Sequence, residues 1–422
     1  MDDAREAVQR RTLRLLFVTQ ILGGIGAGIG FSVGAMLATQ MAGVAFSGLA
    51  QSAAVVGGAL VVIPATRITQ RHGRRQSLAA TYLVAAIGGA VVVAAAILNL
   101  APLFFAGLFL FGGGNAASLQ ARYTAVDLAS ERHRGRDLSI VVWATTIGAV
   151  AGPNLASVAG AAVSPYGIPT LAGPFVFSAL AFAVACVLLV LFMRPDPLVL
   201  ARSTRGTPDS SAAASIARQS GMHWALTVVR ASPAATLGIA ATAIGHVVMV
   251  GVMSMTPVHI MAASSSPAHT LRIVGIVLSF HVIGMFAFAP VTGWLSDRYG
   301  RRPVILGGTV LLLLACLIAG TAGHETVQLT VGLNLLGLGW SGTMVGGSTL
   351  LSDSIPADGR PSVQGLSDLI MGLAGALAGA LSGFAMKGGG YPLVASLAAV
   401  AVLPLLVFAA RPLQRAAGYN RA

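Results

Sequence analysis

The stretch Gly293-Trp294-Leu295-Ser296-Asp297-Arg298-Tyr299-Gly300-Arg301-Arg302 lies between two long apolar segments. It combines one acid, two glycines and three arginines in ten residues. A shorter copy, Arg71-His72-Gly73-Arg74-Arg75, occurs 227 residues earlier. Asp127 and Asp353 repeat at nearly the same spacing. A repeat on this scale predicts two homologous halves.

Apolar segments flank both copies along the whole chain. Of its 422 residues, 55% are hydrophobic and only 9% are charged, whereas soluble domains carry about 25% charged residues. A helix needs roughly 20 apolar residues to cross a hydrocarbon core of about 30 Å. The sequence predicts twelve such spans, at residues 13–38, 44–66, 76–98, 101–123, 138–161, 169–193, 234–262, 270–292, 303–321, 326–351, 362–386 and 391–411.

The repeat and the spans together predict an all-α membrane protein with twelve transmembrane helices, arranged as two parallel six-helix repeats. The expected boundaries are an N-terminal bundle at residues 1–193, a linker at 194–233 and a C-terminal bundle at 234–422. Parallel repeats of this kind are typical of transporters in which two halves move about a site near the middle of the membrane.

The distribution of arginine predicts the orientation. The net charge is +13, and most arginines lie at the two termini, in the linker and in every second loop. The positive-inside rule therefore predicts cytoplasmic termini and a multi-pass protein of the cell (inner) membrane. No basic patch is interleaved with aromatic residues as in nucleic-acid-binding domains. The expected partners are the lipid bilayer and a small solute or ion, with the chain acting as a monomer and no nucleic acid.

The stretch at 293–302 resembles the signature loop of the major facilitator superfamily, abbreviated MFS. The resemblance implies the MFS fold and a cytoplasmic latch that opens during transport. The implied gating residues are Gly293, Asp297, Arg298, Gly300, Arg301 and Arg302, with Arg71, Gly73 and Arg74 in the N-terminal copy. Glycine at 293 allows close helix approach, and glycine at 300 allows a tight turn. In the N-terminal copy Gln70 replaces the acid and Thr66 replaces the first glycine, so we expect a weaker latch there.

A second resemblance concerns the fifth predicted span. Gly148, Gly152 and Pro153 resemble the glycine-proline signature of the superfamily's antiporters, although Ala156 and Ser157 replace the usual trailing glycines. Small residues at i and i+4 allow close helix contact. The resemblance implies export in exchange for protons.

Histidine and methionine concentrate in the seventh and eighth spans, where residues 246–285 hold nine of the chain's 21. His246, Met249 and Met253 share one helical face. The pairs Met249/Met253 and His281/Met285 also resemble paired motifs of the CcoA-like copper importers, a branch of the same superfamily. Thioether and imidazole select soft ions such as Cu(I), so Met249, Met253, His281 and Met285 are tentative copper ligands. The alternative is ordinary packing of methionine in an apolar core.

Polar residues inside membrane spans are functional candidates by default. The expected contacts for solute or proton coupling are His246, His281, Asp368, Asn115, Asn334 and Trp340. Imidazole exchanges protons near neutral pH, so either histidine could couple transport to a proton gradient.

The sequence thus predicts a secondary transporter, not an enzyme, that carries out proton-coupled efflux of a small organic compound across the plasma membrane. Copper import is the alternative, with copper as substrate. No cofactor is expected apart from the proton gradient. A third hypothesis, an intramembrane enzyme, lacks a His-Glu-x-x-His motif or a Gly-x-Ser-x-Gly motif within a span.

Overall fold

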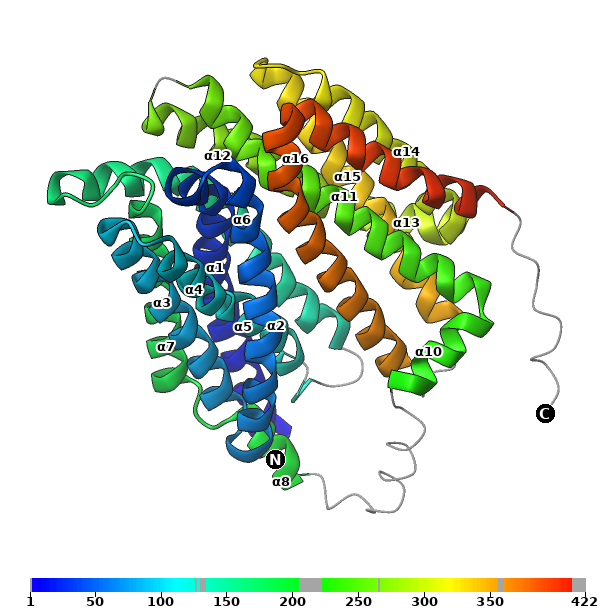
Figure 1. Cartoon of the computed structure of the whole chain (residues 1–422). Helices are drawn as coiled ribbons and strands as arrows, with labels where there is room; N and C mark the ends of the chain where they lie inside the picture. The colour runs from blue at the N-terminus through cyan, green and yellow to red at the C-terminus, as the bar shows by residue number, and fades with distance from the viewer. Residues whose placement is uncertain are drawn as a thin grey trace. The chain divides into compact units, whose positions relative to one another are not determined.

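The computed structural model describes residues 2–125, 127–129, 134–204, 222–264, 266–355 and 360–411. Within these ranges the chain is helical and contains no β-strand (Figure 1). The elements are α1 (Asp2–Ala42), η1 (Val44–Phe46), α2 (Ser47–His72), α3 (Arg74–Leu98), α4 (Ala101–Phe111), α5 (Gly113–Thr124), α6 (Arg134–Val163), η2 (Ser164–Tyr166), α7 (Gly173–Phe192), α8 (Pro197–Thr204), α10 (Met222–Ala231), α11 (Pro233–Ala263), α12 (Pro267–Phe286), α13 (Ala289–Tyr299), α14 (Arg301–Gly320), α15 (Thr326–Asp353) and α16 (Arg360–Ala410).

The helices account for all twelve predicted spans. Ten helical segments of the described ranges are long and apolar enough to cross a membrane. One of them, in α16, contains a kink at Gly389 and Gly390, so it covers the eleventh and twelfth predicted spans. The tenth predicted span is α15, a helix of 28 residues that is not among the ten. The predicted all-α membrane fold is confirmed.

The chain forms two compact units, which are described separately below. The N-terminal unit comprises residues 1–206 and 254–279, and the C-terminal unit comprises 207–253 and 280–422. In the N-terminal unit α1 packs along α6 and α7, and α3 packs against α4 and α7. In the C-terminal unit α14 packs against α15 and α16. The boundaries predicted at 193 and 234 stay a prediction.

Aromatic side chains fill the core of the N-terminal unit. Phe111 makes edge-on contacts with Phe175 and Phe182, with ring centroids 5.5 and 5.2 Å apart. Phe182 also lies 6.0 Å from Tyr82. Edge-to-face aromatic pairs are favourable beyond the apolar area that they bury. These rings hold α3, α4 and α7 around α1.

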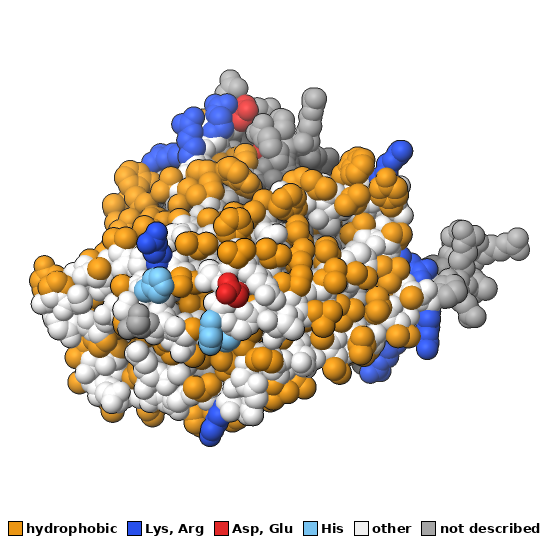
Figure 2. All heavy atoms as spheres, turned by 90° about the horizontal axis from the view of Figure 1, so that it is seen from above, with side chains coloured by type: hydrophobic (Ala, Val, Ile, Leu, Met, Phe, Trp, Pro, Cys, Tyr) orange, Lys and Arg blue, Asp and Glu red, His pale blue; other side chains and the backbone are white. Residues whose placement is uncertain are grey.

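Large apolar side chains are exposed on the outside of the helices. On α16, Leu373, Leu377 and Leu381 repeat every four residues and are each more than half exposed. Figure 2 likewise shows a face dominated by hydrophobic side chains, with few acidic ones. An apolar surface of this extent marks contact with lipid.

Candidate solute site and gating loops

Four methionines gather around a tryptophan in the C-terminal unit. Met249, Val250 and Trp340 are buried, and Met253, Met285, Phe286 and Met344 pack against them. We call these seven residues the Met/Trp cluster. Its members come from α11, α12 and α15, so the structure brings together the three predicted methionines and adds Met344, which has no neighbouring motif in the sequence.

His246 contacts the Met/Trp cluster through a hydrogen bond. The indole Nε1 of Trp340 donates to Nδ1 of His246 at 3.3 Å. On its other side the His246 ring faces Gly375 of α16, where an added Cβ would lie 2.5 Å from Cδ2. Trp340 also stacks edge-on against Phe286, with centroids 5.8 Å apart. His246 and Trp340, both predicted from the sequence, are therefore in direct contact, with their rings inclined at 48° to each other.

His281 is held differently. Its Nδ1 lies 2.8 Å from the carbonyl oxygen of Leu333 on α15. A carbonyl oxygen can only accept, so Nδ1 must carry the hydrogen. The side chain is fully buried, and Nε2 has no hydrogen-bond partner among the described residues. The imidazole thus presents a lone pair inside the protein, in the form that binds a proton or a metal ion.

Asn334 ties the same two helices together. Its Nδ2 donates to the carbonyl oxygen of Phe280 at 2.8 Å, next to His281. The helices are close here, because a Cβ at Gly284 would lie only 2.5 Å from the carbonyl oxygen of Asn334. Asn334 therefore acts as a link between α12 and α15 in this structure.

Two further predicted residues, Asn115 and Asp368, are not members of the Met/Trp cluster. Asn115 is half-buried on α5 of the N-terminal unit, where its Cβ lies beside Gly58 of α2. Asp368 belongs to the C-terminal unit and is exposed on α16.

The signature loop forms an ion-pair network in the C-terminal unit. Arg301 Nε donates to Asp353 at 2.8 Å, and Arg301 Nη1 lies 3.3 Å from Asp297. Gly300 has a φ of +94°, a conformation that residues with a Cβ rarely adopt. Arg298 is exposed. The turn at Gly300 thus sets Arg301 between two acids.

The N-terminal copy of the loop repeats this geometry. Gly73 has a φ of +91°, and Arg74 Nε donates to Asp127 at 2.8 Å. The repeat read from the sequence is therefore also a repeat in three dimensions. Arg71 is exposed, as is Arg298. The N-terminal ion pair is the more buried of the two, since its side chains are 15% and 11% exposed against 28% and 51% for Arg301 and Asp353.

Two contacts at these loops were not foreseen from the sequence. Asp196, just after α7, accepts a hydrogen bond from the backbone N–H of Arg75 at 2.7 Å, so a carboxylate from outside the loop stands beside the copy that lacks its own acid. Arg302 donates to the backbone carbonyls of Ala409 and Arg411 at the end of α16. Both contacts join segments more than 100 residues apart in the chain, so no local sequence pattern predicts them.

The role expected for Gly293 is not seen. A Cβ added at this position would meet nothing within 4 Å among the described residues. Gly293 therefore does not mediate a close helix contact within the C-terminal unit as the structure describes it. The expectation rested on the usual function of glycine in helix crossings, and that function needs a second helix at the same level.

The antiporter-like motif packs as its small residues predict. A Cβ at Gly152 would lie 2.6 Å from the carbonyl oxygen of Ile25 on α1, and Gly148 meets the backbone of α1 one turn earlier. On α1, Gly24 and Gly28 face the same contact. Pro153, inside α6, lies opposite Gly28. The motif forms a close, glycine-lined crossing of α1 and α6.

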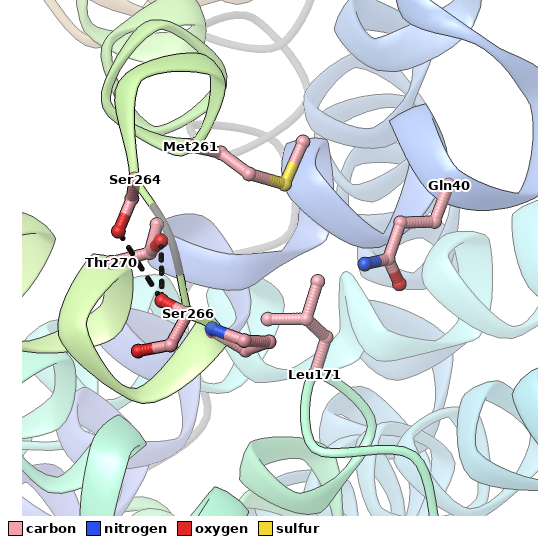
Figure 3. Close-up of a pocket in the computed structure, with 7 residues that line it drawn as sticks. Gln40, Leu171, Met261, Ser264, Ser266 and Thr270 are labelled. Carbon is pink, nitrogen blue, oxygen red and sulfur yellow. Dashed lines mark hydrogen bonds between the residues drawn. The ribbon is translucent and has the colours of Figure 1, made fainter.

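A small cavity opens in the N-terminal unit (Figure 3). It has a volume of about 110 Å³ and is lined by Gln40, Leu171, Met261, Ser264, Ser266, Pro267 and Thr270. Ligand pockets for organic molecules measure about 300–1,000 Å³. The cavity is of a size for water or an ion, and none of the predicted site residues lines it.

Comparison with known proteins identifies the fold. The sequence model of the Major Facilitator Superfamily matches residues 15–268 and 261–420. The chain belongs to the major facilitator superfamily. It is 37% identical to the uncharacterized MFS-type transporter YdeG of Bacillus subtilis over 411 residues, covering 96% of this chain and 93% of that protein.

Other MFS relatives match over the same length. The riboflavin transporter RfnT of Brucella anthropi is 28% identical over 413 residues, which is 96% of this chain and 97% of RfnT. Among solved structures, the nucleoside transporter NupG aligns with a TM-score of 0.71 at 14% identity, covering 96% of this chain and all of NupG. A D-xylose-proton symporter aligns with a TM-score of 0.68 at 18% identity, over 94% of this chain and 97% of that one.

These MFS proteins are transporters, and the chain described here is a multi-pass membrane transporter of the same superfamily. The likeness to the solved structures shows the MFS fold alone. Within that fold, the Met/Trp cluster brings methionine and aromatic side chains together with the imidazole of His246.

Proposed function

We propose that this chain is a secondary transporter that moves a small, flat organic compound by proton-coupled alternating access. The observation that carries the proposal is the contact between His246, Trp340 and Phe286 inside a membrane bundle. A tryptophan face with a polar imidazole beside it offers stacking and one directional hydrogen bond to a ring compound. The proposal assigns transport and no chemical step.

The direction proposed is outward, from a monomer in the inner membrane with both termini in the cytoplasm. The arginine distribution supports this orientation, and the antiporter-like crossing of α1 and α6 supports exchange of solute against protons. No cofactor enters the proposal; the proton gradient supplies the free energy.

The solute class follows from the residues of the Met/Trp cluster. Thioethers and aromatic rings contact ring compounds favourably, and none of the cluster's members carries a charge. An uncharged or weakly charged heteroaromatic compound fits this surface. The full-length similarity to a riboflavin transporter makes riboflavin the first compound to test.

The test is riboflavin flux in proteoliposomes with and without a proton gradient. We expect gradient-dependent flux that falls at least tenfold in Trp340→Ala. Phe177→Ala, at an exposed position of α7 in the N-terminal unit, is the matched control and should transport normally. Flux that does not depend on the proton gradient would rule out proton coupling. Equal flux in Trp340→Ala and Phe177→Ala would rule out the proposed solute site at Trp340.

Copper import is the second candidate, because of two observations. Met249, Met253 and Met285 pack in a single cluster, and the buried Nε2 of His281 has no hydrogen-bond partner among the residues that the structure describes. A metal-binding imidazole commonly has its other nitrogen fixed by a carbonyl, as Leu333 fixes Nδ1 here.

Methionine-to-leucine substitutions decide this candidate, since they conserve volume while removing sulfur. If copper is the substrate, cells expressing the protein should accumulate more copper, and Met249→Leu, Met253→Leu and Met285→Leu should each abolish the gain. Met36→Leu, buried in α1, is the control. If expression leaves the copper content of the cells unchanged, copper is not the substrate, and the methionines serve only to pack the core.

A further inference from the structure

The hydrogen bond between Trp340 and His246 determines where the imidazole carries its hydrogen. The indole N–H is a donor and cannot accept. Nδ1 of His246, 3.3 Å from Trp340 Nε1, must therefore be the acceptor. The uncharged ring then carries its hydrogen on Nε2. Trp340 thus selects one tautomer of His246.

The Nε2–H group created in this way has no acceptor among the described residues. The hydrogen bond to Trp340 is made by the other ring nitrogen, and Nε2 faces Gly375, where an added Cβ would lie 2.9 Å away. Glycine at 375 lets the imidazole ring pack closely against α16, because a Cβ at that position would overlap the ring. An unmade hydrogen bond at a half-buried donor costs free energy unless water or a solute completes it.

His281 carries its hydrogen on the other ring nitrogen. There a backbone carbonyl, which is an acceptor only, requires the hydrogen on Nδ1, so Nε2 offers a lone pair. His246 and His281 are therefore held in opposite tautomers. One presents a donor beside the aromatic surface of Trp340, and the other presents an acceptor within the protein.

We propose that His246 is the specificity-determining hydrogen-bond donor of the solute site, with Trp340 as the positioning residue that keeps the hydrogen on Nε2. This proposal rests on the proposed function. It adds the chemical feature by which the site recognises its solute. That feature is a hydrogen-bond acceptor, a ring nitrogen or carbonyl oxygen, in the plane of a flat ring system. Gly375 leaves room for the imidazole in this position beside Trp340.

The first measurement reads the tautomer directly. Nitrogen NMR of ¹⁵N-histidine-labelled protein in nanodiscs, assigned with His246→Gln, should show His246 protonated on Nε2 and unprotonated on Nδ1. In Trp340→Phe, which keeps the ring but lacks the N–H, the two tautomers should mix. A hydrogen on Nδ1 in the wild type, or no change in Trp340→Phe, would overturn the proposal.

The second measurement uses riboflavin as the probe, followed by quenching of its fluorescence on binding. His246→Leu, which has no donor, should bind riboflavin at least about tenfold more weakly, because the acceptor loses its partner. His246→Gln retains an N–H donor and should recover most of the affinity. Equal binding in the Leu and Gln variants, with both folded by size-exclusion chromatography, would overturn the role as donor.

The two measurements separate the failure of this proposal from the failure of the proposed function. If wild-type protein does not bind riboflavin, the flavin assignment falls, and the role of His246 is then decided by the tautomer and by the same Leu and Gln variants with quinoline. Quinoline has a ring nitrogen as acceptor, and naphthalene is its counterpart without one. Preference for quinoline in the wild type that disappears in His246→Leu supports the proposal, and no preference contradicts it.

Discussion

A single polar residue inside a membrane bundle must find partners, because lipid offers none. Gln20 in α1 is 1% exposed, and its amide is fully used. Its Oε1 accepts from Tyr82 at 2.7 Å, and its Nε2 donates to Ser118 and Thr145 at 3.1 Å each. One side chain thus links α1 to α3, α5 and α6, which makes it a structural residue.

The hydrogen bond from Tyr82 to Gln20 should contribute to the stability of the N-terminal unit. Tyr82→Phe removes the hydroxyl that donates to Gln20 and leaves an amide oxygen buried without its partner. We expect a loss of about 1–3 kcal/mol in stability, measured by thermal unfolding in detergent. Combining it with Gln20→Leu should lose less than the sum of the two single changes. Strict additivity would mean that the hydrogen bond contributes nothing.

Gly375 of α16 lies directly against the imidazole of His246. A methyl group there would lie 2.5 Å from His246 Cδ2, so the imidazole must move away from its position beside Trp340. Gly375→Ala should lower solute flux severalfold while the protein still folds. Gly372→Ala, where an added Cβ meets nothing within 4 Å, is the control on the same helix. Equal flux in the two variants would show that the position of His246 is unimportant.

At the scale of elements, glycine determines which helices approach closely. Along α1 and α6 the glycines of both helices face each other's backbone, so the helices cross without intervening side chains. Close crossings of this kind gain dispersion contacts where lipid supplies no hydrophobic driving force. α12 and α15 use Gly284 and Gly337 in the same way.

Substitution at two glycines tests this account of packing. Gly152→Ala places a methyl group 2.6 Å from the carbonyl oxygen of Ile25, whereas Gly307→Ala on α14 meets nothing within 4 Å. We expect Gly152→Ala to lower the melting temperature and the folded yield. Gly307→Ala should leave both unchanged or slightly raised, since alanine is the better helix former. The reverse order would show that the α1–α6 crossing can relax.

At the scale of the whole molecule, the duplicated halves carry equivalent ion pairs in different surroundings. The more buried pair is Arg74–Asp127, and the more exposed pair is Arg301–Asp353. Exposed pairs contribute about 0–1 kcal/mol, whereas loss of one partner from a buried pair leaves an uncompensated charge. The missing acid at Gln70 predicts a weaker N-terminal latch. The burial of the Arg74–Asp127 ion pair should instead make this latch stronger.

Asparagine substitution separates the two pairs. Asp127→Asn should lower the melting temperature more than Asp353→Asn, because the arginine left unpaired is the less exposed one. Asp353→Asn should instead alter the rate of transport more than stability, since Arg301 keeps Asp297. Differential scanning fluorimetry and flux measurements on the same preparations check both. A larger stability loss in Asp353→Asn would contradict the burial argument.

Much of this molecule could be predicted from local features. Span length and apolar content depend on residues adjacent in the chain, so all twelve predicted spans coincide with helices. The signature loop likewise predicted a tight turn at Gly300, and the structure has a positive φ both there and at Gly73 in the N-terminal copy. The grouping of Met249, Met253 and Met285 was indicated by helical spacing on neighbouring spans.

Local patterns along the chain were therefore enough to predict the membrane helices, the duplication and the types of residue at the candidate site. The contacts between distant residues could be seen only in the folded protein. Trp340 meets His246, 94 residues away, and Asp196 meets Arg75, whereas no described atom lies within 4 Å of a Cβ added at Gly293. The physical reason is that hydrophobicity and helix length act along the chain, whereas a hydrogen bond depends on two atoms lying within about 3 Å and correctly oriented. That condition is met only once the helices have packed.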